Sequence, residues 1–427
     1  MKEKETPTPF LKLHFPIGTV INFFHLGTIQ ISNALLQILL FPVIIHVVGL
    51  SSFGHVMVAN SYAGLIGIFI NYGTNQSGIK DIALVKDNPA LLSEKFYSVF
   101  YIRILLFIAS LLVLPFLHFF SVPNFTYFIF ANALIFSEVL NPIFFFIGIE
   151  KLLVYNIANL ISKVASILLI IFLVKGSADS YQVNFYLGIS SIAIFSFLFL
   201  YAIKKYKIHF HLPRLVPLWH FLKENFFLVG NNISVHLQQS IFLFALASTG
   251  NTLVLGAYAF CDKIIWAFRL LLIAFSSAIY PRSTVLYHNE HEQWKKYKKT
   301  INLLFCVVFL ISAGVFLAFP SFIVTLFTGE TNALGVTYVR AIAFTPLMIA
   351  LNSLNLLELL IRNAYTSIFK ISIYILILSA LVSATLLWLN APTYFAYYPL
   401  IIESSCLGLY LYYLSKNSYN GHPSHST

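Results

Sequence analysis

The stretch that decides the fold runs from Phe53 to Tyr72 and reads FGHVMVANSYAGLIGIFINY. It is 20 residues long and contains no Lys, Arg, Asp or Glu, and about 20 apolar residues suffice for a helix to cross a bilayer core. The rest of the chain has the same character, since 59% of its 427 residues are hydrophobic and only 10% are charged. Soluble domains have roughly 25% charged residues. The sequence therefore predicts an all-α polytopic membrane protein and excludes a water-soluble fold.

Further apolar runs, bounded by polar residues or by Gly and Pro, bring the predicted number of transmembrane helices to twelve. The runs are Val20–Val47, Phe53–Tyr72, Tyr97–His118, Phe125–Ile147, Leu152–Val174, Tyr181–Tyr201, Phe226–Ala247, Leu253–Ile273, Ile301–Phe319, Ala333–Leu357, Ser367–Leu389 and Phe395–Tyr413. The first run has no small-residue cleavage site and is predicted to be a retained span. The longest linkers, at His211–His220 and Pro281–Thr300, are too short for an independent domain, which needs about 50 residues.

The cations are distributed unevenly between the linkers. Nineteen of the 26 Lys and Arg residues fall in alternate linkers on one side of the predicted membrane, and Lys175 alone lies in a linker on the other side. Cytoplasmic loops carry the excess of Lys and Arg, so both termini are predicted to be cytoplasmic. The formal net charge of +11 is then a topology signal and not a nucleic-acid-binding surface.

The cysteines, Cys261, Cys306 and Cys406, lie in apolar runs and are predicted to be free thiols.

The two halves of the chain are weakly similar to each other at an offset of 202 residues. This offset places Phe53-Gly54 on Leu255-Gly256 and Asn60 on Asp262. Because each half holds an even number of spans, the halves are predicted to form two six-helix lobes related by a parallel internal repeat. We expect a first lobe over residues 1–205, a basic cytoplasmic linker over 206–223, a second lobe over 224–416 and a short cytoplasmic tail over 417–427.

Several ionisable residues fall inside predicted spans, where each costs about 2.5–3.5 kcal/mol and usually faces a bundle interior or a wet cavity. The cations are Arg103, Lys163, Lys263, Arg269 and Arg340, and the acids are Glu138, Asp262 and Glu403. Glu138 and Lys163 are predicted to lie at similar depth in neighbouring spans, as a structural ion pair or as an ion-coupling site. Asp262 and Arg269 share a face of the eighth span, and the excess of cations favours an anion-binding cavity.

Amides and one histidine form polar stripes on three predicted helices. The stripes are Gln30, Asn33 and Gln37 in the first span, Asn60 and Asn71 in the second, and Asn232, His236 and Gln239 in the seventh. Such stripes line a polar cavity or hydrogen-bond neighbouring helices, and both interpretations stay open. Together with the cations they suit a phosphate-linked sugar. The sequence has no G-x-x-x-x-G-K-[ST] phosphate loop and no H-E-x-x-H motif, so we expect no catalytic residue, metal site or cofactor.

Three motifs lie at the predicted ends and starts of spans. The first is PVIIHVVG at 42–49 followed by Phe53-Gly54, and the second is NYGTNQSGIKDIA at 71–83, which includes Asn75. The third is GAYAFCDKII at 256–265, continued by IYPR at 279–282. With them the chain resembles bacterial O-antigen and capsular polysaccharide flippases of the multidrug/oligosaccharidyl-lipid/polysaccharide (MOP) exporter superfamily. Many relatives have an acid where this chain has Asn71, so an acid-based coupling role does not carry over to this position.

The resemblance implies two six-helix lobes around a central cationic cavity, working by alternating access in the bacterial inner membrane. Such flippases move an undecaprenyl-pyrophosphate-linked oligosaccharide between leaflets, driven by an ion gradient, of H⁺ or Na⁺, or by the membrane potential. We therefore expect a transporter and not an enzyme, with the lipid-linked oligosaccharide, membrane lipids, a polysaccharide polymerase and a chain-length regulator as partners. The cavity is expected to use Arg269, Lys263, Arg340, Arg103, Asn75 and the polar stripes, with Asp262, Glu138, Lys163 and Glu403 as coupling or structural residues.

Two other classes of protein stay open. A drug or metabolite cation antiporter of the same superfamily would need acids in its cavity, and here the bases outnumber them. A membrane polysaccharide polymerase would need a sizeable external loop with ionisable groups. The predicted external linkers hold almost none beyond Lys175, Asp179 and Glu330.

Overall fold

The computed structural model describes residue 36 and residues 39–212 and 215–419, and these residues form helices and no β-strand. Nine of the helices in this part of the chain are long and apolar enough to span a membrane, which confirms the predicted fold class. Two more predicted spans are the helices α10 (Leu215–Ala247) and α17 (Tyr398–Tyr419). Most of the first predicted span lies outside the described residues, and its end is the short apolar helix Leu39–Val48.

The first lobe follows the chain from α2 to α9. Its helices are α2 (Leu50–Asn71), α3 (Ser77–Val85), α4 (Pro89–Ser110), α5 (Val113–Phe119), α6 (Phe125–Leu140), α7 (Ile143–Gly148), α8 (Leu152–Leu173) and α9 (Val183–Lys205), with a 3-10 turn at Ser177–Gln182. The side chain of Asn88 starts α4 because its oxygen accepts from two amides of the first turn, at 3.1 and 3.2 Å. Pro142 divides the fourth predicted span into α6 and α7, because proline has no amide to continue the helix.

The second lobe begins with α10 and ends with α17. Between them lie α11 (Thr252–Asn289), α12 (His291–Ala318), α13 (Pro320–Thr328), α14 (Ala333–Ala341), α15 (Thr345–Ile361), α16 (Tyr365–Leu389) and a 3-10 turn at Pro392–Tyr397. Asn251 and Asn332 cap the starts of α11 and α14. α14 and α15 are the two parts of the tenth predicted span, and Pro346 lies in the first turn of α15. Both lobes therefore interrupt their fourth span next to a proline, as an internal repeat predicts.

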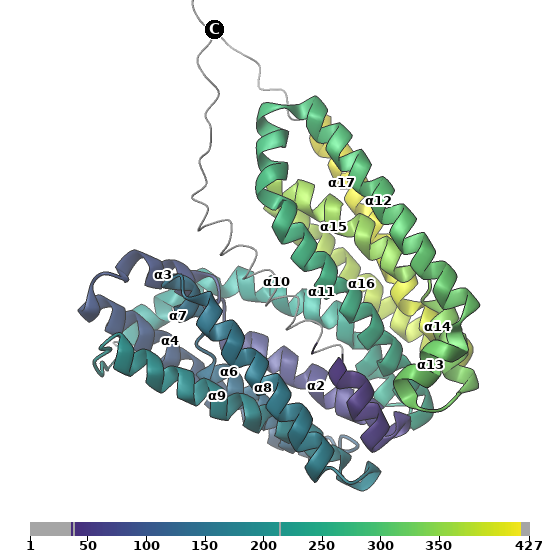
Figure 1. Cartoon of the computed structure of the whole chain (residues 1–427), viewed down its shortest axis with the longest axis horizontal. Helices are drawn as coiled ribbons and strands as arrows, with labels where there is room; N and C mark the ends of the chain where they lie inside the picture. The colour runs from purple at the N-terminus through teal and green to yellow at the C-terminus, as the bar shows by residue number, and fades with distance from the viewer. Residues whose placement is uncertain (1–35, 37–38, 213–214, 420–427) are drawn as a thin grey trace, which may run out of the picture.

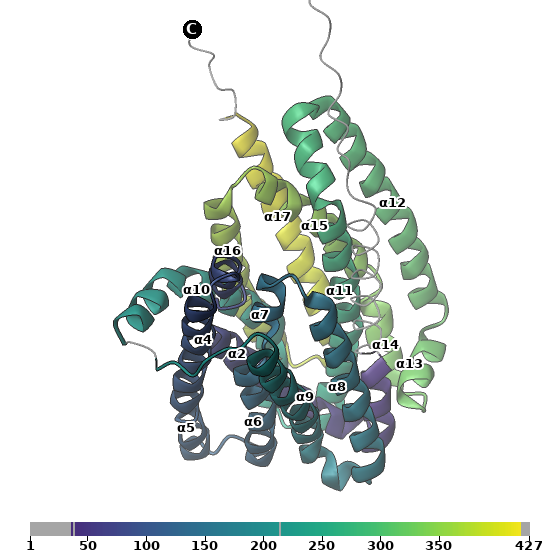
Figure 2. The same cartoon turned by 60° about the vertical axis from the view of Figure 1, so that its left-hand side comes forward.

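The prediction of a linker at Pro281–Thr300 is wrong. α11 continues through Pro281, and a single residue, Glu290, separates it from α12. The cause is a cluster that apolar runs do not reveal: Trp294 is 2% exposed and packs against the C-terminal part of α15. The burial of Trp294 stabilises α11 and α12 beyond their apolar runs. Figure 1 and Figure 2 show α11 and α12 side by side up to the turn that joins them.

The lobes meet where α2 crosses α11, and two glycines make this crossing. A Cβ atom on Gly54 would lie 2.8 Å from the amide nitrogen of Gly256, and one on Gly256 would lie 2.0 Å from the carbonyl oxygen of Leu50. The backbones approach this closely because neither glycine has a side chain. Gly54 and Gly256 are 202 residues apart, the offset of the repeat. Equivalent residues thus touch each other, as they do on a two-fold axis.

Away from this crossing the lobes diverge as two arms (Figure 1). The spread ends are the ones next to the lysine-rich linkers, with α3 and α7 on one arm and the turn between α11 and α12 on the other. There Lys86 Nζ lies 2.8 Å from Glu150 Oε1, and this hydrogen bond lowers the pKa of the Glu150 carboxyl. α10 joins the arms, because its Asn225 lies against Gly73 of the first lobe and its later turns pack on α16.

The crossing predicts a large effect of a small side chain. Gly256→Ala should destabilise the protein by about 1–3 kcal/mol, the usual cost of overpacking, because the new methyl group displaces the backbone of α2. The matched control is Gly314→Ala in α12, where a Cβ meets nothing within 4 Å and alanine favours the helix. Thermal unfolding of the protein in detergent measures both, and equal midpoints for the two variants would contradict this account of the crossing.

Candidate functional site

Two ion pairs involve α11, and they differ in how they are built. Lys263 Nζ lies 3.2 Å from Asp262 Oδ2, a neighbour on the same helix. Arg269 Nη2 donates at 2.8 Å to Glu403 Oε1 of α17. All four side chains are 11–16% exposed, and buried charges need such partners. The second acid near α11 is thus Glu403, which balances the cation excess that the sequence indicated for this helix.

Glu403 also fixes the positions of three helices. Asn352 Nδ2 of α15 donates to Glu403 Oε2 at 2.8 Å and to its carbonyl oxygen at 2.9 Å. The network of Arg269, Glu403 and Asn352 therefore joins α11, α15 and α17 inside the second lobe. An anion that replaced Glu403 as the partner of Arg269 would break this connection between the helices.

Arg103 of α4 is fully buried and uses all its donors. Nε and Nη2 donate to Thr74 Oγ1 at 3.0 and 2.7 Å, and Nη2 also donates to Asn75 Oδ1 at 3.0 Å. Nη1 donates to the carbonyl oxygens of Glu138 and Asn141 at 3.2 and 2.5 Å. A guanidinium has five N–H groups, so none remains for a ligand. Arg103 is a structural residue in this arrangement and not part of the cationic cavity that the sequence indicated.

The carbonyl groups that Arg103 binds are free because of Pro142. A helix bonds each carbonyl to the amide four residues later, and Pro142 has no amide to offer Glu138. The residue before a proline is also driven out of the α region, and Asn141 has φ −65° and ψ 105°. The Arg103 guanidinium lies 5.0 Å from the ring centroid of Phe144, in the next turn. We call this set of contacts the Arg103 socket.

Glu138 lies at the edge of the Arg103 socket. Its Oε2 atom accepts from Asn71 Nδ2 at 2.9 Å and from Asn141 Nδ2 at 3.2 Å. The donors to this carboxylate are thus amides of the first lobe, in place of the Lys163 ammonium that was predicted to pair with it. Asn71 and Asn75, both predicted for the cavity, serve here as partners of Glu138 and Arg103.

Two residues of the polar stripes join neighbouring helices. Asn60 Nδ2 donates to Asn184 Oδ1 of α9 at 3.3 Å. His236 Nε2 of α10 lies 2.9 Å from the carbonyl oxygen of Ser61 in α2. The imidazole also covers Gly64, where a Cβ would lie 2.8 Å from His236 Cε1. Helix packing accounts for both residues.

The other predicted site residues are not gathered around one centre. Asn232 and Gln239 are half-buried on α10, and Arg340 is exposed in the last turn of α14. Gln30, Asn33 and Gln37 lie outside the described residues. In the part of the chain that the structure describes, Asn71, Asn75 and Glu138 gather around Arg103, and Glu403 pairs with Arg269. The Lys263–Asp262 pair is separate from both clusters.

An apolar cavity of about 300 Å³ lies beside Lys263 where the lobes meet. Its walls come from helix Leu39–Val48, α2, α11, α12 and α13, with Phe41, Phe53 and Phe260 among them. Of the described residues that line it, Lys263 alone is charged, and its Nζ lies 5.9 Å from the ring centroid of Phe41. Apolar walls with one placed charge are typical of ligand sites and suit an apolar chain that carries an anionic group.

The residues that complete these clusters could hardly be recognised from the sequence. Thr74 is one of several polar residues in the motif at 71–83, and Asn352 is followed by Ser353 and Asn355. Nothing local assigns Thr74 to Arg103 or Asn352 to Glu403. The dipeptide Asn141-Pro142 was the visible signal, because a proline inside an apolar run predicts an interrupted helix and free carbonyl groups.

Two crossing lobes of membrane-spanning helices, with ion pairs inside the second lobe and a buried arginine inside the first, are typical of a multi-pass membrane transporter. Residues 20–287 match the polysaccharide biosynthesis protein family, and the chain belongs to this family, which consists of transporters and not of enzymes. A proposed O-antigen transporter of Shigella dysenteriae is 26% identical to it over 332 residues, 76% of this chain and 81% of that protein. A proposed O-antigen transporter of Escherichia coli K12 is 24% identical over 386 residues, 86% of this chain and 88% of that one.

Among solved structures, the fold is similar to a multidrug resistance MATE family transporter of the MOP superfamily in its inward-facing conformation. The TM-score is 0.73 at 12% sequence identity, and the match covers 93% of this chain and 99% of that one. This likeness shows the fold.

The Arg103 socket predicts that lysine cannot replace its arginine. Arg103→Lys and Arg103→Met should each destabilise the protein by at least about 3 kcal/mol, because buried acceptors are left without donors and lysine has only three N–H groups. Arg282→Met, which removes an exposed arginine, is the control and should change little. The midpoint of thermal unfolding in detergent measures all three, and an unchanged midpoint for Arg103→Lys would contradict the socket.

The Arg269–Glu403 pair predicts strong coupling between two distant positions. Arg269→Gln and Glu403→Gln should each destabilise the second lobe, and the double variant should lose about 0.5–3 kcal/mol less than the sum of the single losses. The reason is that each single change leaves the other charge buried without its partner. Unfolding midpoints of the four proteins give the coupling, and strictly additive losses would show that the pair does not stabilise the lobe.

Proposed function

We propose that this protein is a flippase that moves an undecaprenyl-pyrophosphate-linked oligosaccharide, such as an O-antigen repeat unit, across the bacterial inner membrane. Membership of the polysaccharide biosynthesis family and the names of two relatives support the proposal. The observation that carries it is the apolar cavity with Lys263 in its wall. A polyprenyl pyrophosphate joins an apolar chain to an anionic group, and the cavity offers a contact to each.

The Lys263–Asp262 pair gives a route to energy coupling. A pyrophosphate carries more negative charge than one carboxylate, so it competes with Asp262 for the Lys263 ammonium. Once displaced, Asp262 is an uncompensated charge at membrane depth, which is costly. We infer that it then takes up H⁺ or Na⁺, so that binding of the cargo is linked to uptake of the coupling ion.

The arrangement of the lobes supports alternating access. Gly54 and Gly256 let the backbones of α2 and α11 come into contact, and we infer that the lobes rotate as rigid bodies about this contact. The arms diverge toward the lysine-rich ends (Figure 1), and the positive-inside rule assigns these ends and both termini to the cytoplasm. We infer that the cargo enters from the cytoplasm between the diverging arms, and that the unit released outside is a substrate for the predicted polymerase and its chain-length regulator.

Reconstitution tests the proposal directly. The full-length protein is placed in liposomes that carry a defined undecaprenyl-pyrophosphate-linked glycan, and an external probe measures how much glycan is accessible, with and without an H⁺ or Na⁺ gradient. Gradient-dependent exposure of the glycan is the expected result. Export of organic cations with no exposure of the glycan would instead favour the drug antiporter and refute the flippase.

Lys263 should be required for transport and Lys370 should not. Lys263→Gln is expected to reduce the initial rate of glycan exposure at least tenfold, since a hydrogen bond to a charged group contributes about 1.5–3 kcal/mol. Lys370→Gln changes an exposed cation on α16 and is the matched control. Equal rates for the two variants in the liposome assay would remove Lys263 from the site.

A further inference from the structure

A second cavity lies at the lysine-rich end of the second lobe, between α12 and the end of α15. Its volume is about 350 Å³, and its charged lining consists of Lys295, Lys298, Lys299, Arg362 and Glu358. It shares no lining residue with the apolar cavity beside Lys263. We call it the basic cavity.

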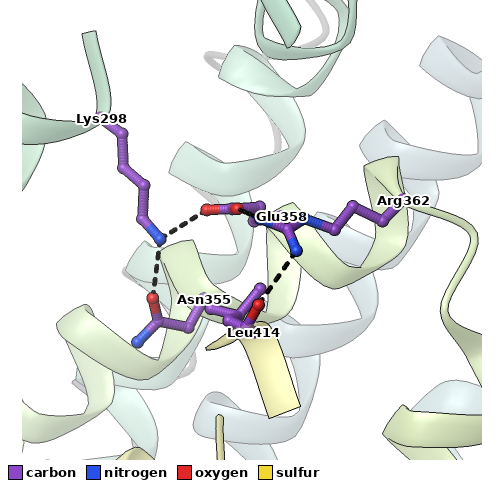
Figure 3. A network of polar contacts seen from close by, with 5 residues as sticks. All are labelled: Lys298, Asn355, Glu358, Arg362 and Leu414. Atoms are coloured by element: carbon purple, nitrogen blue, oxygen red, sulfur yellow. Dashed lines mark hydrogen bonds and ion pairs between the residues drawn. The ribbon is translucent and has the colours of Figure 1, made fainter. Parts of the chain in front are cut away.

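The inner wall of the basic cavity is a fixed network (Figure 3). Glu358 is 8% exposed and lies between Lys298, at 2.6 Å from its Oε2, and Arg362, which bonds its Oε1. Lys298 also donates to Asn355 Oδ1 at 2.9 Å, and Arg362 donates to the carbonyl oxygen of Leu414 at 3.1 Å. Two cations thus share one carboxylate, and the wall keeps a positive charge.

The rim of the basic cavity adds to this charge. Lys295 and Lys299 are exposed and lie one turn apart on α12, and Glu292 accepts from Lys295 at 2.8 Å. Four cations therefore face two carboxylates. Arg362 also has a buried Nε–H group without a partner among the described residues. A buried N–H donor needs an acceptor, and a phosphate oxygen is a suitable one.

The surface of α12 below the rim is apolar and exposed. Leu303, Val307 and Ile311 follow Lys295 and Lys299 at steps of four residues, and they are 65%, 50% and 64% exposed. Residues four apart are neighbours along a helix surface. This surface suits a molecule that has a phosphate at one end and hydrocarbon chains next to it. The phosphate would contact the lysines, and the hydrocarbon chains would contact the apolar stripe.

We propose that the basic cavity binds the phosphate headgroup of an anionic phospholipid whose acyl chains lie along α12. Basic cavities between transmembrane helices bind anionic headgroups in this way. The lipid bridges α12 and α15, which the buried Trp294 also joins, and so supports the long hairpin of α11 and α12. The site belongs to the surrounding membrane and not to the cargo, and it stands whether or not the protein moves a glycan.

Native mass spectrometry of the full-length protein, titrated with phosphatidylglycerol in neutral detergent, tests the proposal. Lys295→Gln/Lys299→Gln should weaken binding about 25-fold, since each lysine at such a surface contributes roughly fivefold. The matched control is Lys204→Gln/Lys205→Gln, which removes two exposed lysines from the last turn of α9, at the lysine-rich end of the first lobe. The control should keep the affinity of the unchanged protein, and phosphatidylcholine should bind all three proteins equally weakly.

Unchanged affinity of Lys295→Gln/Lys299→Gln overturns the proposal, and so does an equal loss in the control, which indicates only general attraction to the surface. Inorganic phosphate is the second arm of the experiment. If it displaces phosphatidylglycerol at equal concentration, the cavity is a site for free phosphate and the lipid is excluded. The unfolding midpoint without lipid shows whether each variant is folded. If the double variant does not fold, the single variants Lys295→Gln and Lys299→Gln are measured in its place.

Discussion

The structure depends on the contact between two backbones at Gly54 and Gly256. Side chains there would push the lobes apart, because even a single Cβ on Gly256 would lie 2.0 Å from a carbonyl oxygen. The close approach brings Phe53 of α2 and Phe260 of α11 into the wall of one cavity. The lobes also share the packing of α2 on α11 and on α10 around this point, and they still diverge at their lysine-rich ends (Figure 1).

The interrupted helix of the first lobe explains why an arginine is buried in the membrane. No water is available in a bilayer core to satisfy a free carbonyl group, and Pro142 frees the carbonyls of Glu138 and Asn141. Arg103 supplies the missing donors from α4 and uses its remaining N–H groups on the turn after α2. The cation is therefore a consequence of the broken helix and not evidence for an anionic ligand.

The sequence predicted those features that the bilayer imposes on each helix separately. Apolar runs located the spans, and the offset of 202 related Gly54 to Gly256. The cytoplasmic side that the cations indicate stays a prediction. Pairing between helices was not predictable in this way, because Arg269 and Glu403 are 134 residues apart and their depth does not identify which helices are neighbours. The hairpin of α11 and α12 was missed because Trp294 is buried beyond the apolar runs, where the rules of soluble proteins apply.

The buried charges differ in whether their bonds join different helices or lie within one helix. The bonds of Arg103 join α2, α4 and the α6–α7 break, and those of Arg269 join α11 to α17, so a ligand that replaced them would loosen a lobe. Lys263 and Asp262 are neighbours on one helix, and opening their pair separates no helices. Lys263 also lines the apolar cavity. Of Arg103, Arg269 and Lys263, a ligand can therefore exchange with the partner of Lys263 at the lowest structural cost, which is the reason to assign the anionic group of the proposed cargo to Lys263 and not to Arg269.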